Sequence, residues 1–319
     1  MLRTVLGVGW FALGVARAYA MDVDAAILTR LEHQTVESCR PISAAECGQA
    51  EALFLRSLLA GADIEKLQPE WSQLGMQLTR IPPDGDPAGD EANHVWLLTE
   101  HDDHHRGRGA YAFRNDWRFA VCLAAPHSFY DRNTREIAAS LFANNRIPTA
   151  AWNTAHRRHC DLAHREASYL NSWTSAFVQA CGQDSIVLQV HGFDATRRHS
   201  LAGHGSDIIA SDATRSPSPW TLQAVQSLKA GMPQYRISLF PRDVDELGAT
   251  TNMQAKAARQ VGPHHFLHLE MNGSVRRDLL EQKPPVMDFV KLIAAAGRQI
   301  DSIGEAVPIA SPFTTAKDR

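Results

Sequence analysis

Short, almost wholly apolar runs alternate with segments of helical periodicity along most of the chain after residue 90. Apolar runs predict strands at 95–98, 109–113, 119–125, 149–152, 185–190, 207–210, 235–240 and 266–270. Periodic segments predict helices at 133–144, 160–181, 221–230, 251–260 and 285–302. Because strands buried on both faces alternate with helices, we predict an α/β fold with a mixed, largely parallel central sheet flanked by helices.

The N-terminal quarter of the chain follows a helical pattern. Residues 22 to about 75 carry apolar side chains at helical spacing, and the proline- and glycine-rich stretch Pro82–Pro87 follows them. We therefore expect a small N-terminal helical element at 21–85, an α/β domain at 90–305 and a loose tail at 306–319.

The first twenty residues have the features of a secretory signal peptide. Arg3 precedes an apolar run at 5–16, and Ala18-Tyr19-Ala20 fits the small-x-small cleavage rule. A buried N-terminal helix is the alternative, against which Arg17 and three glycines in this segment count. No later stretch approaches the roughly 18 apolar residues of a membrane span. We expect a mature protein that begins at Met21 and is periplasmic or secreted.

Composition narrows the class of partner. A hydrophobic content of 44% and a charged content of 21% are ordinary for a globular protein. The formal net charge of −3 argues against non-specific nucleic-acid binding. The fifteen histidines, many of them clustered, favour a metal site.

The five cysteines fit an oxidising compartment. A local Cys39–Cys47 bridge and a Cys160–Cys181 bridge are both plausible, although sequence leaves the pairing open. Cys122 lies in an apolar run and is expected to be buried. Because no Cys-x-x-Cys spacing occurs, a zinc site made of thiolates is not expected.

Metal-ligand side chains follow two of the predicted strands. His127 and Asp131 come after the run at 119–125, and His191 comes after the run at 185–190. The carboxyl ends of parallel strands meet at one edge of a sheet, where ligand sites form. Two imidazoles and one carboxylate leave a fourth position for water, which is the pattern of a catalytic zinc. The alternatives are a packed or turn role for the histidines and a helix N-cap role for Asp131.

Glu270 ends the last predicted strand and is the candidate general base. Its alternatives are a structural ion pair with Arg276 or Arg277, or a fourth metal ligand. Arg276 is instead a candidate for stabilising the oxyanion of the reaction.

The order of these residues resembles the zinc carboxypeptidase-like fold, over roughly residues 90–285. The segments Ala125-Pro126-His127-Ser128 and His268-Leu269-Glu270-Met271-Asn272 are similar to the N-formylglutamate amidohydrolase group. The resemblance implies zinc held by His127, Asp131 and His191, with Glu270 catalytic. It also implies an arginine that holds a substrate carboxylate, for which Arg157 and Arg158 compete, beside Asn153. This chain departs from carboxypeptidases, which place a glutamate three residues after the first histidine.

Two other segments carry possible chemistry. The cluster His101–Gly109 has metal-ligand spacing, but its glycines and its place between two strands favour a hairpin loop, with a substrate-rim role left open. Ser128 lacks a Gly-x-Ser-x-Gly elbow and is a poor nucleophile.

The sequence thus predicts an exported zinc-dependent hydrolase. We expect it to cleave an amide bond in a carboxylate-bearing substrate, such as an N-acyl or N-formyl amino acid, a γ-glutamyl linkage or a cell-wall peptide. A zinc esterase or deacetylase, or a non-catalytic periplasmic metal-binding protein, are the alternatives.

Overall fold

The computed structural model describes residues 23–37, 39–81, 94–103, 105–281 and 288–301. The predicted signal peptide at 1–20 and the predicted tail at 306–319 lie outside the described residues, as does most of the expected domain boundary near 85–90. These predictions therefore stay predictions.

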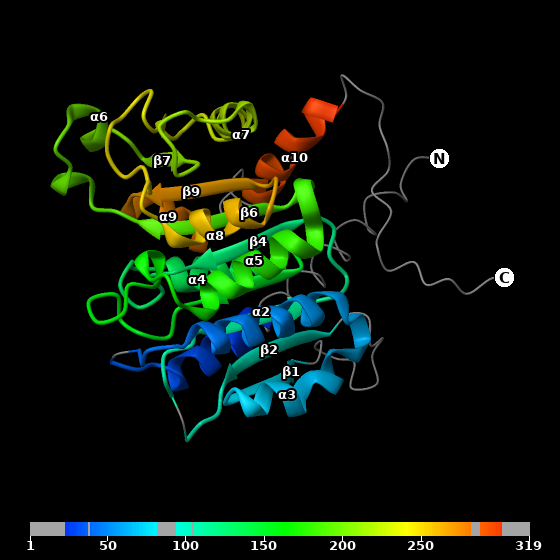
Figure 1. Ribbon diagram of the computed structural model, residues 1–319. Coiled ribbons are helices and arrows are strands. Elements are labelled where there is room, and N and C mark those ends of the chain that lie inside the picture. The colour runs from blue at the N-terminus through cyan, green and yellow to red at the C-terminus, as the bar shows by residue number, and fades with distance from the viewer. Residues whose placement is uncertain (1–22, 38, 82–93, 104, 282–287, 302–319) are drawn as a thin grey trace, which may run out of the picture.

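A mixed nine-stranded sheet forms the centre of the described chain, in the order β1-β2-β3-β5-β4-β6-β9-β7-β8 (Figure 1). Its strands are β1 (Met76–Ile81), β2 (Val95–Glu100), β3 (Ala110–Arg114), β4 (Val121–Ala125), β5 (Thr149–Trp152), β6 (Ile186–Gly192), β7 (Ile208–Ser211), β8 (Ile237–Leu239) and β9 (His265–Met271). Neighbours in the central group β5-β4-β6-β9 are parallel, and β1, β2 and β3 extend the sheet as antiparallel strands. The predicted mixed α/β sheet is confirmed, and the ends of the four central strands share one edge.

Helices cover both faces of the sheet. The helices are a segment at 23–33, α2 (Ala44–Leu59), α3 (Gln68–Gln73), α4 (Thr134–Asn145), α5 (Tyr169–Cys181), α6 (Leu201–His204), α7 (Pro219–Gly231), α8 (Met253–Val261), α9 (Gly273–Leu280) and α10 (Phe289–Asp301), with 3-10 turns η1 (Gly61–Leu67), η3 (Leu162–His164), η4 (Gly182–Asp184) and η5 (Ala195–Arg197). One face packs on 23–33, α4, α7, α9 and α10, and the other on α2, α3, α5 and α8.

The alternation of side chains along β4 shows how one strand serves both cores. Leu123 lies in the core under α4 and α7, whereas Cys122 and Ala124 lie in the core under α5 and α8. Successive side chains of a strand point to opposite faces, so a strand covered on both faces must be apolar throughout. This requirement explains why the apolar run at 119–125 predicts a buried strand.

Two elements differ from the prediction. The helix expected from residue 160 begins only at Tyr169, because Ser168 is in an extended conformation and its hydroxyl accepts a hydrogen bond from the Asn171 amide as an N-cap. The strand β1 was not predicted, because three of its central positions are partly exposed or exposed and polar, so it lacks the continuous apolar run of the central strands.

The predicted disulfide pairs are wrong. Cys39 is bonded to Cys160, with a Cα–Cα distance of 5.6 Å, and Cys47 and Cys181 are free. The reason is tertiary: the amide of Val36 donates to the Thr154 carbonyl at 2.9 Å, which aligns the segment before Cys39 with the loop before Cys160. Cys122 is fully buried, as predicted.

No helix among the described residues is long and apolar enough to cross a membrane.

Candidate metal centre

A tight turn after β4 brings Asp131 back onto His127. The amides of Tyr130 and Asp131 both donate to the His127 carbonyl, at 2.8 and 2.9 Å. The Asp131 carboxylate does not cap α4, whose N-cap position is Asn133. It lies instead 3.1 Å from His127 Nδ1 and accepts the amide of Gly192 at 3.1 Å. The turn therefore converts a spacing of four residues into a contact between two ligand-type side chains.

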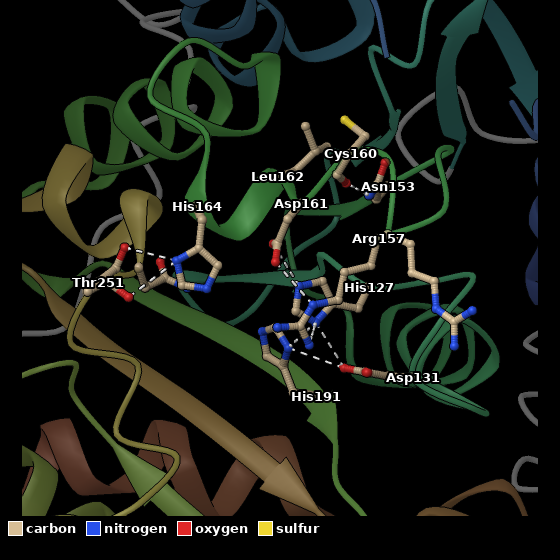
Figure 2. A network of polar contacts seen from close by, with 12 residues as sticks. His127, Asp131, Asn153, Arg157, Cys160, Asp161, Leu162, His164, His191 and Thr251 are labelled. Carbon is tan, nitrogen blue, oxygen red and sulfur yellow. Dashed lines mark hydrogen bonds and ion pairs between the residues drawn. The ribbon is translucent and has the colours of Figure 1, made fainter. Parts of the chain in front are cut away.

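The end of β6 brings His191 to the same point. His191 Nδ1 lies 3.0 Å from His127 Nδ1 and 3.3 Å from the Asp131 carboxylate, and Figure 2 shows the three side chains turned toward one another. All three are buried. The structure thus brings together the three residues predicted as zinc ligands.

The spacing of these three ligand atoms fits a metal ion. Zinc bonds of about 2.0–2.1 Å at tetrahedral angles place ligand atoms about 3.3 Å apart. The observed separations in the cluster are 3.0, 3.1 and 3.3 Å. Two imidazole nitrogens this close would set their lone pairs against each other unless a proton or a cation lay between them. The donor set, the burial and the spacing therefore all suit a divalent cation of the zinc type.

Asp161 contacts His127 on the side of Nε2, and the sequence did not predict it as a residue of the site. Its carboxylate is 3.1 Å from His127 Nε2 and 3.1 Å from the Arg157 guanidinium (Figure 2). Burial alone would raise the pKa of Asp161, but the hydrogen bond with His127 and the nearby charges lower it to about 2. A carboxylate on the far nitrogen of an imidazole fixes its tautomer and leaves Nδ1 free as a ligand. No motif marks Asp161 in the sequence, because only the fold brings it to His127.

Glu270 stands beside His191 on the neighbouring strand. The two residues are directly paired in the register of β6 and β9, so their side chains lie on the same face of the sheet. The Glu270 Oε2 atom is buried without a hydrogen-bond partner among the described residues. Burial, together with the Asp131 charge, raises the pKa of Glu270 to about 7. Glu270 is thus a carboxyl group that changes its charge near neutral pH next to the cluster.

His268 is a second residue that sequence reasoning missed. It precedes Glu270 by two positions on β9, is buried, and lies with its Nε2 3.7 Å from the Glu270 carboxylate. His191, His268 and Glu270 form a second buried group whose ligand atoms lie within 4.8 Å of one another. The period of two along a strand was the signal that could have found His268, since it shares the face of Glu270.

The protonation of the buried groups follows from their surroundings. Burial and the nearby His127 lower the pKa of His191 to about 4, so its imidazole is neutral at pH 7. Burial alone would raise the pKa of Asp131, but hydrogen bonds with His127 and His191 hold it well below the usual range. A neutral imidazole and an ionised carboxylate are the forms that bind a metal.

The predicted substrate-binding residues fall in different places. Arg157 lies at the cluster, with Nη1 3.3 Å from His127 Nδ1. Both arginines lie over the Tyr130 ring, at 5.6 Å for Arg157 and 5.8 Å for Arg158, and no contact of Arg158 with the cluster is seen among the described residues. The Asn153 amide is used within its own loop, where it donates to the Cys160 carbonyl and accepts from the Ala155 amide. Of the two arginines, Arg157 is the one placed to meet a substrate at the cluster.

Arg276, the predicted oxyanion stabiliser, is held by main-chain carbonyls. It donates to the carbonyls of Asn272, Arg132 and Phe193. Its guanidinium also lies against Gly192, where an added Cβ would approach it to 2.6 Å. These bonds engage the guanidinium with the main chain. Stabilisation of the oxyanion by Arg276 therefore stays a prediction.

The two remaining candidate segments, 101–109 and Ser128, lie in a loop and in a turn. The cluster at 101–109 connects the antiparallel strands β2 and β3, as the predicted hairpin loop does, although His104 lies outside the described residues. The Ser128 hydroxyl donates to the Ala125 carbonyl at 2.6 Å, a local bond that suits the turn.

No family model and no curated protein matches the sequence. Solved structures that align with the chain include N-formylglutamate amidohydrolase from Ralstonia eutropha JMP134, at 9% identity and a TM-score of 0.39, covering 62% of this chain and 98% of that one. A bacteriophage poly-γ-glutamate hydrolase aligns at 11% identity and a TM-score of 0.38, covering 59% and 87%. A gene product of Agrobacterium tumefaciens aligns at 12% identity and a TM-score of 0.41, covering 61% and 91%.

The first of these proteins bears the name of the group that the motifs around His127 and Glu270 resemble. All three TM-scores lie below 0.5, so the function proposed for this chain rests on its own strand-end residues.

Proposed function

We propose that the protein is an exported, zinc-dependent hydrolase that cleaves an amide bond in a carboxylate-bearing substrate. His127, Asp131 and His191 would hold the metal, and Glu270 would be the general base. One observation carries the proposal: three ligand atoms separated by 3.0–3.3 Å lie beside a buried carboxylate, one oxygen of which has no hydrogen-bond partner among the described residues. A closed structural zinc site has four protein ligands, whereas this cluster has three and a neighbouring base.

Each group in the cluster has chemistry that suits hydrolysis. Zinc in such a site supplies a Lewis acid and makes a bound water more acidic. Glu270, with a pKa raised to about 7, can accept a proton and return it near neutral pH. Asp161 holds His127 in one orientation through its far nitrogen. These roles need no nucleophilic side chain.

Arg157 is the proposed clamp for the substrate carboxylate. Its guanidinium is about one-third exposed and is already oriented by Asp161 at 3.1 Å. A planar guanidinium can hold a carboxylate through two parallel hydrogen bonds. Arg158 stays the alternative, and Asn153 supports the loop that carries both.

Export is proposed from the signal-peptide features of residues 1–20, and the Cys39–Cys160 disulfide supports it. Disulfides persist in oxidising compartments such as the periplasm and the medium. Sequencing the N-terminus of the protein from its native host tests this, with Met21 expected first. A protein that still begins at Met1 would contradict export.

The variant Glu270→Gln separates the enzyme from its rivals. We expect it to retain zinc and to lose turnover of N-acyl and N-formyl amino acids, γ-glutamyl amides and short peptides. Undiminished turnover would refute the assigned base. Hydrolysis by the wild type of acyl esters or N-acetyl sugars, and of none of these amides, would favour the esterase or deacetylase alternative. Stoichiometric zinc with no turnover of any of these compounds would favour a non-catalytic metal-binding protein.

A further inference from the structure

A cavity of about 190 Å³ opens beside the loop that joins β2 to β3. Its lining residues are Arg40, Asp103, His105 and Arg106. Two of these side chains are guanidinium groups and one is an imidazole. The cavity therefore presents more positive than negative charge.

The main chain around the cavity is tightly fixed. The buried Glu100 carboxylate accepts the successive amides of Arg106, Gly107 and Arg108, at 2.6, 2.9 and 3.0 Å. Gly107 has a φ of +75°, and a Cβ there would come within 2.7 Å of the Cys39 Cβ. Residues 106–108 are thus folded around a carboxylate, and Gly107 is packed against the disulfide.

Arg40 is joined to the same loop from two sides. Its amide donates to the Arg106 carbonyl at 2.8 Å, and its carbonyl accepts from the Arg108 guanidinium at 2.8 Å. Arg40 and Arg106 are therefore held next to each other by their backbones.

Three of the side chains that line the cavity, those of Arg40, His105 and Arg106, keep polar atoms without a hydrogen-bond partner among the described residues. Within the described part of the chain, the guanidinium groups of Arg40 and Arg106 have no hydrogen bond or ion pair, and the buried Nε2 of His105 has no hydrogen-bond partner. Asp103 offsets part of the charge. A rigid backbone that presents unengaged donors is the arrangement of a preformed anion site.

The cavity lies within reach of the metal centre. Arg40 follows Cys39, Asp161 follows Cys160, and these cysteines have Cα atoms 5.6 Å apart. Because consecutive Cα atoms are about 3.8 Å apart, Arg40 and Asp161 have Cα atoms at most about 13 Å apart. An extended chain of about four residues spans this upper limit.

We propose that this cavity is a substrate subsite that binds a carboxylate within about four residues of the scissile bond. The substrate is then an acidic peptide rather than a single acylated amino acid. This inference rests on the proposed function, because it places the substrate relative to the metal centre. A free phosphate offers similar chemistry, and the test separates the two.

Binding of tetraglutamate, tetraglutamine and inorganic phosphate to the zinc-loaded mature protein tests the subsite, by isothermal titration calorimetry. The Glu270→Gln background prevents cleavage of the peptides during the titration. The test variant is Arg40→Ala/Arg106→Ala. The matched control is Arg56→Ala/Arg215→Ala, which removes two exposed arginines that pair with Glu70 and Asp245. A count of free thiols and the zinc content verify that the fold and the metal centre are intact.

We expect tetraglutamate to bind at least about tenfold more tightly than tetraglutamine, and the test variant to lose about tenfold in tetraglutamate affinity. The control should keep its affinity, and Arg40→Lys/Arg106→Lys should keep most of it. Equal tetraglutamate affinity in the test variant and its parent would overturn the subsite. Phosphate that binds as tightly as tetraglutamate would overturn the peptide claim. The proposed activity alone would be refuted if the peptide binds tightly through these arginines but the wild-type protein, which retains Glu270, turns over no peptide.

Discussion

Replacing Glu270 with glutamine should change the pH dependence of folding stability in the metal-free protein. Burial and the Asp131 charge raise the pKa of Glu270 from 4.5 to about 7, so the folded protein holds this proton more tightly than the unfolded chain. The resulting stabilisation is fully present below pH 4.5 and is lost as the pH rises through 7. Glutamine has a similar shape and cannot ionise, so the variant lacks this loss.

The size of the effect follows from the pKa values. One pH unit is worth about 1.4 kcal/mol, so a change from 4.5 to about 7 corresponds to about 3 kcal/mol of unfolding free energy. Relative to Glu270→Gln, the wild type should therefore lose about 3 kcal/mol between pH 4.5 and pH 8. His191 acts in the opposite direction, because its pKa of about 4 lies below the unfolded value of 6.5 and its stabilisation is lost as the pH falls. Both proteins retain His191, so its contribution cancels in the difference.

Urea unfolding followed by tryptophan fluorescence measures this difference. Both proteins are first dialysed against a chelator, because a bound cation would favour the Glu270 carboxylate and reduce the effect. Unfolding free energies at pH 4.5, 5.5, 6.5, 7.5 and 8 should diverge steadily between the two proteins. Parallel curves over this range would refute the assignment of Glu270 as a buried carboxyl group with a raised pKa.

Two further predictions follow from the same contacts. Asp161→Asn should weaken zinc binding about 10- to 100-fold, because it removes the carboxylate that contacts His127 Nε2. Competition with a chromophoric chelator measures the affinity, and Asp63→Asn, which changes an exposed residue, is the control. Unchanged zinc affinity in Asp161→Asn would show that this contact does not orient the ligand. Cys39→Ser/Cys160→Ser should lower the unfolding free energy by about 2–5 kcal/mol, since the bridge that it removes closes a loop with a sequence separation of 121. The control is Cys47→Ser, which changes a free cysteine. An equal loss of unfolding free energy in the control would speak against the bridge.

Sequence reasoning was able to predict the part of the fold that hydrophobic burial dictates. The strand β4 is apolar at every position and β6 and β9 are apolar at most positions, because helices cover both faces, and this pattern is local in the sequence. Their parallel arrangement places the carboxyl ends of the strands at one edge, which is why His127, His191 and Glu270 could be proposed as neighbours.

Features that depend on tertiary contacts could not be predicted. Asp161 reaches His127 only through the fold of the loop after β5, and Cys39 meets Cys160 only because the segment before it pairs with that loop. The strand β1 lies at the edge of the sheet with polar positions that resemble a loop in sequence. Asp161 and the Cys39–Cys160 bridge were therefore missed because each depends on a partner far away in the chain.

The zinc content of purified variants tests the central claim most directly. Wild-type protein and the control His199→Ala, which changes an exposed histidine, should each hold about one zinc per chain after removal of loosely bound metal. His127→Ala, Asp131→Ala and His191→Ala should each hold much less, because each loses one of three ligands. Inductively coupled plasma mass spectrometry, with circular dichroism to verify folding, gives the result. Stoichiometric zinc in both His127→Ala and His191→Ala would contradict the metal centre proposed for this protein.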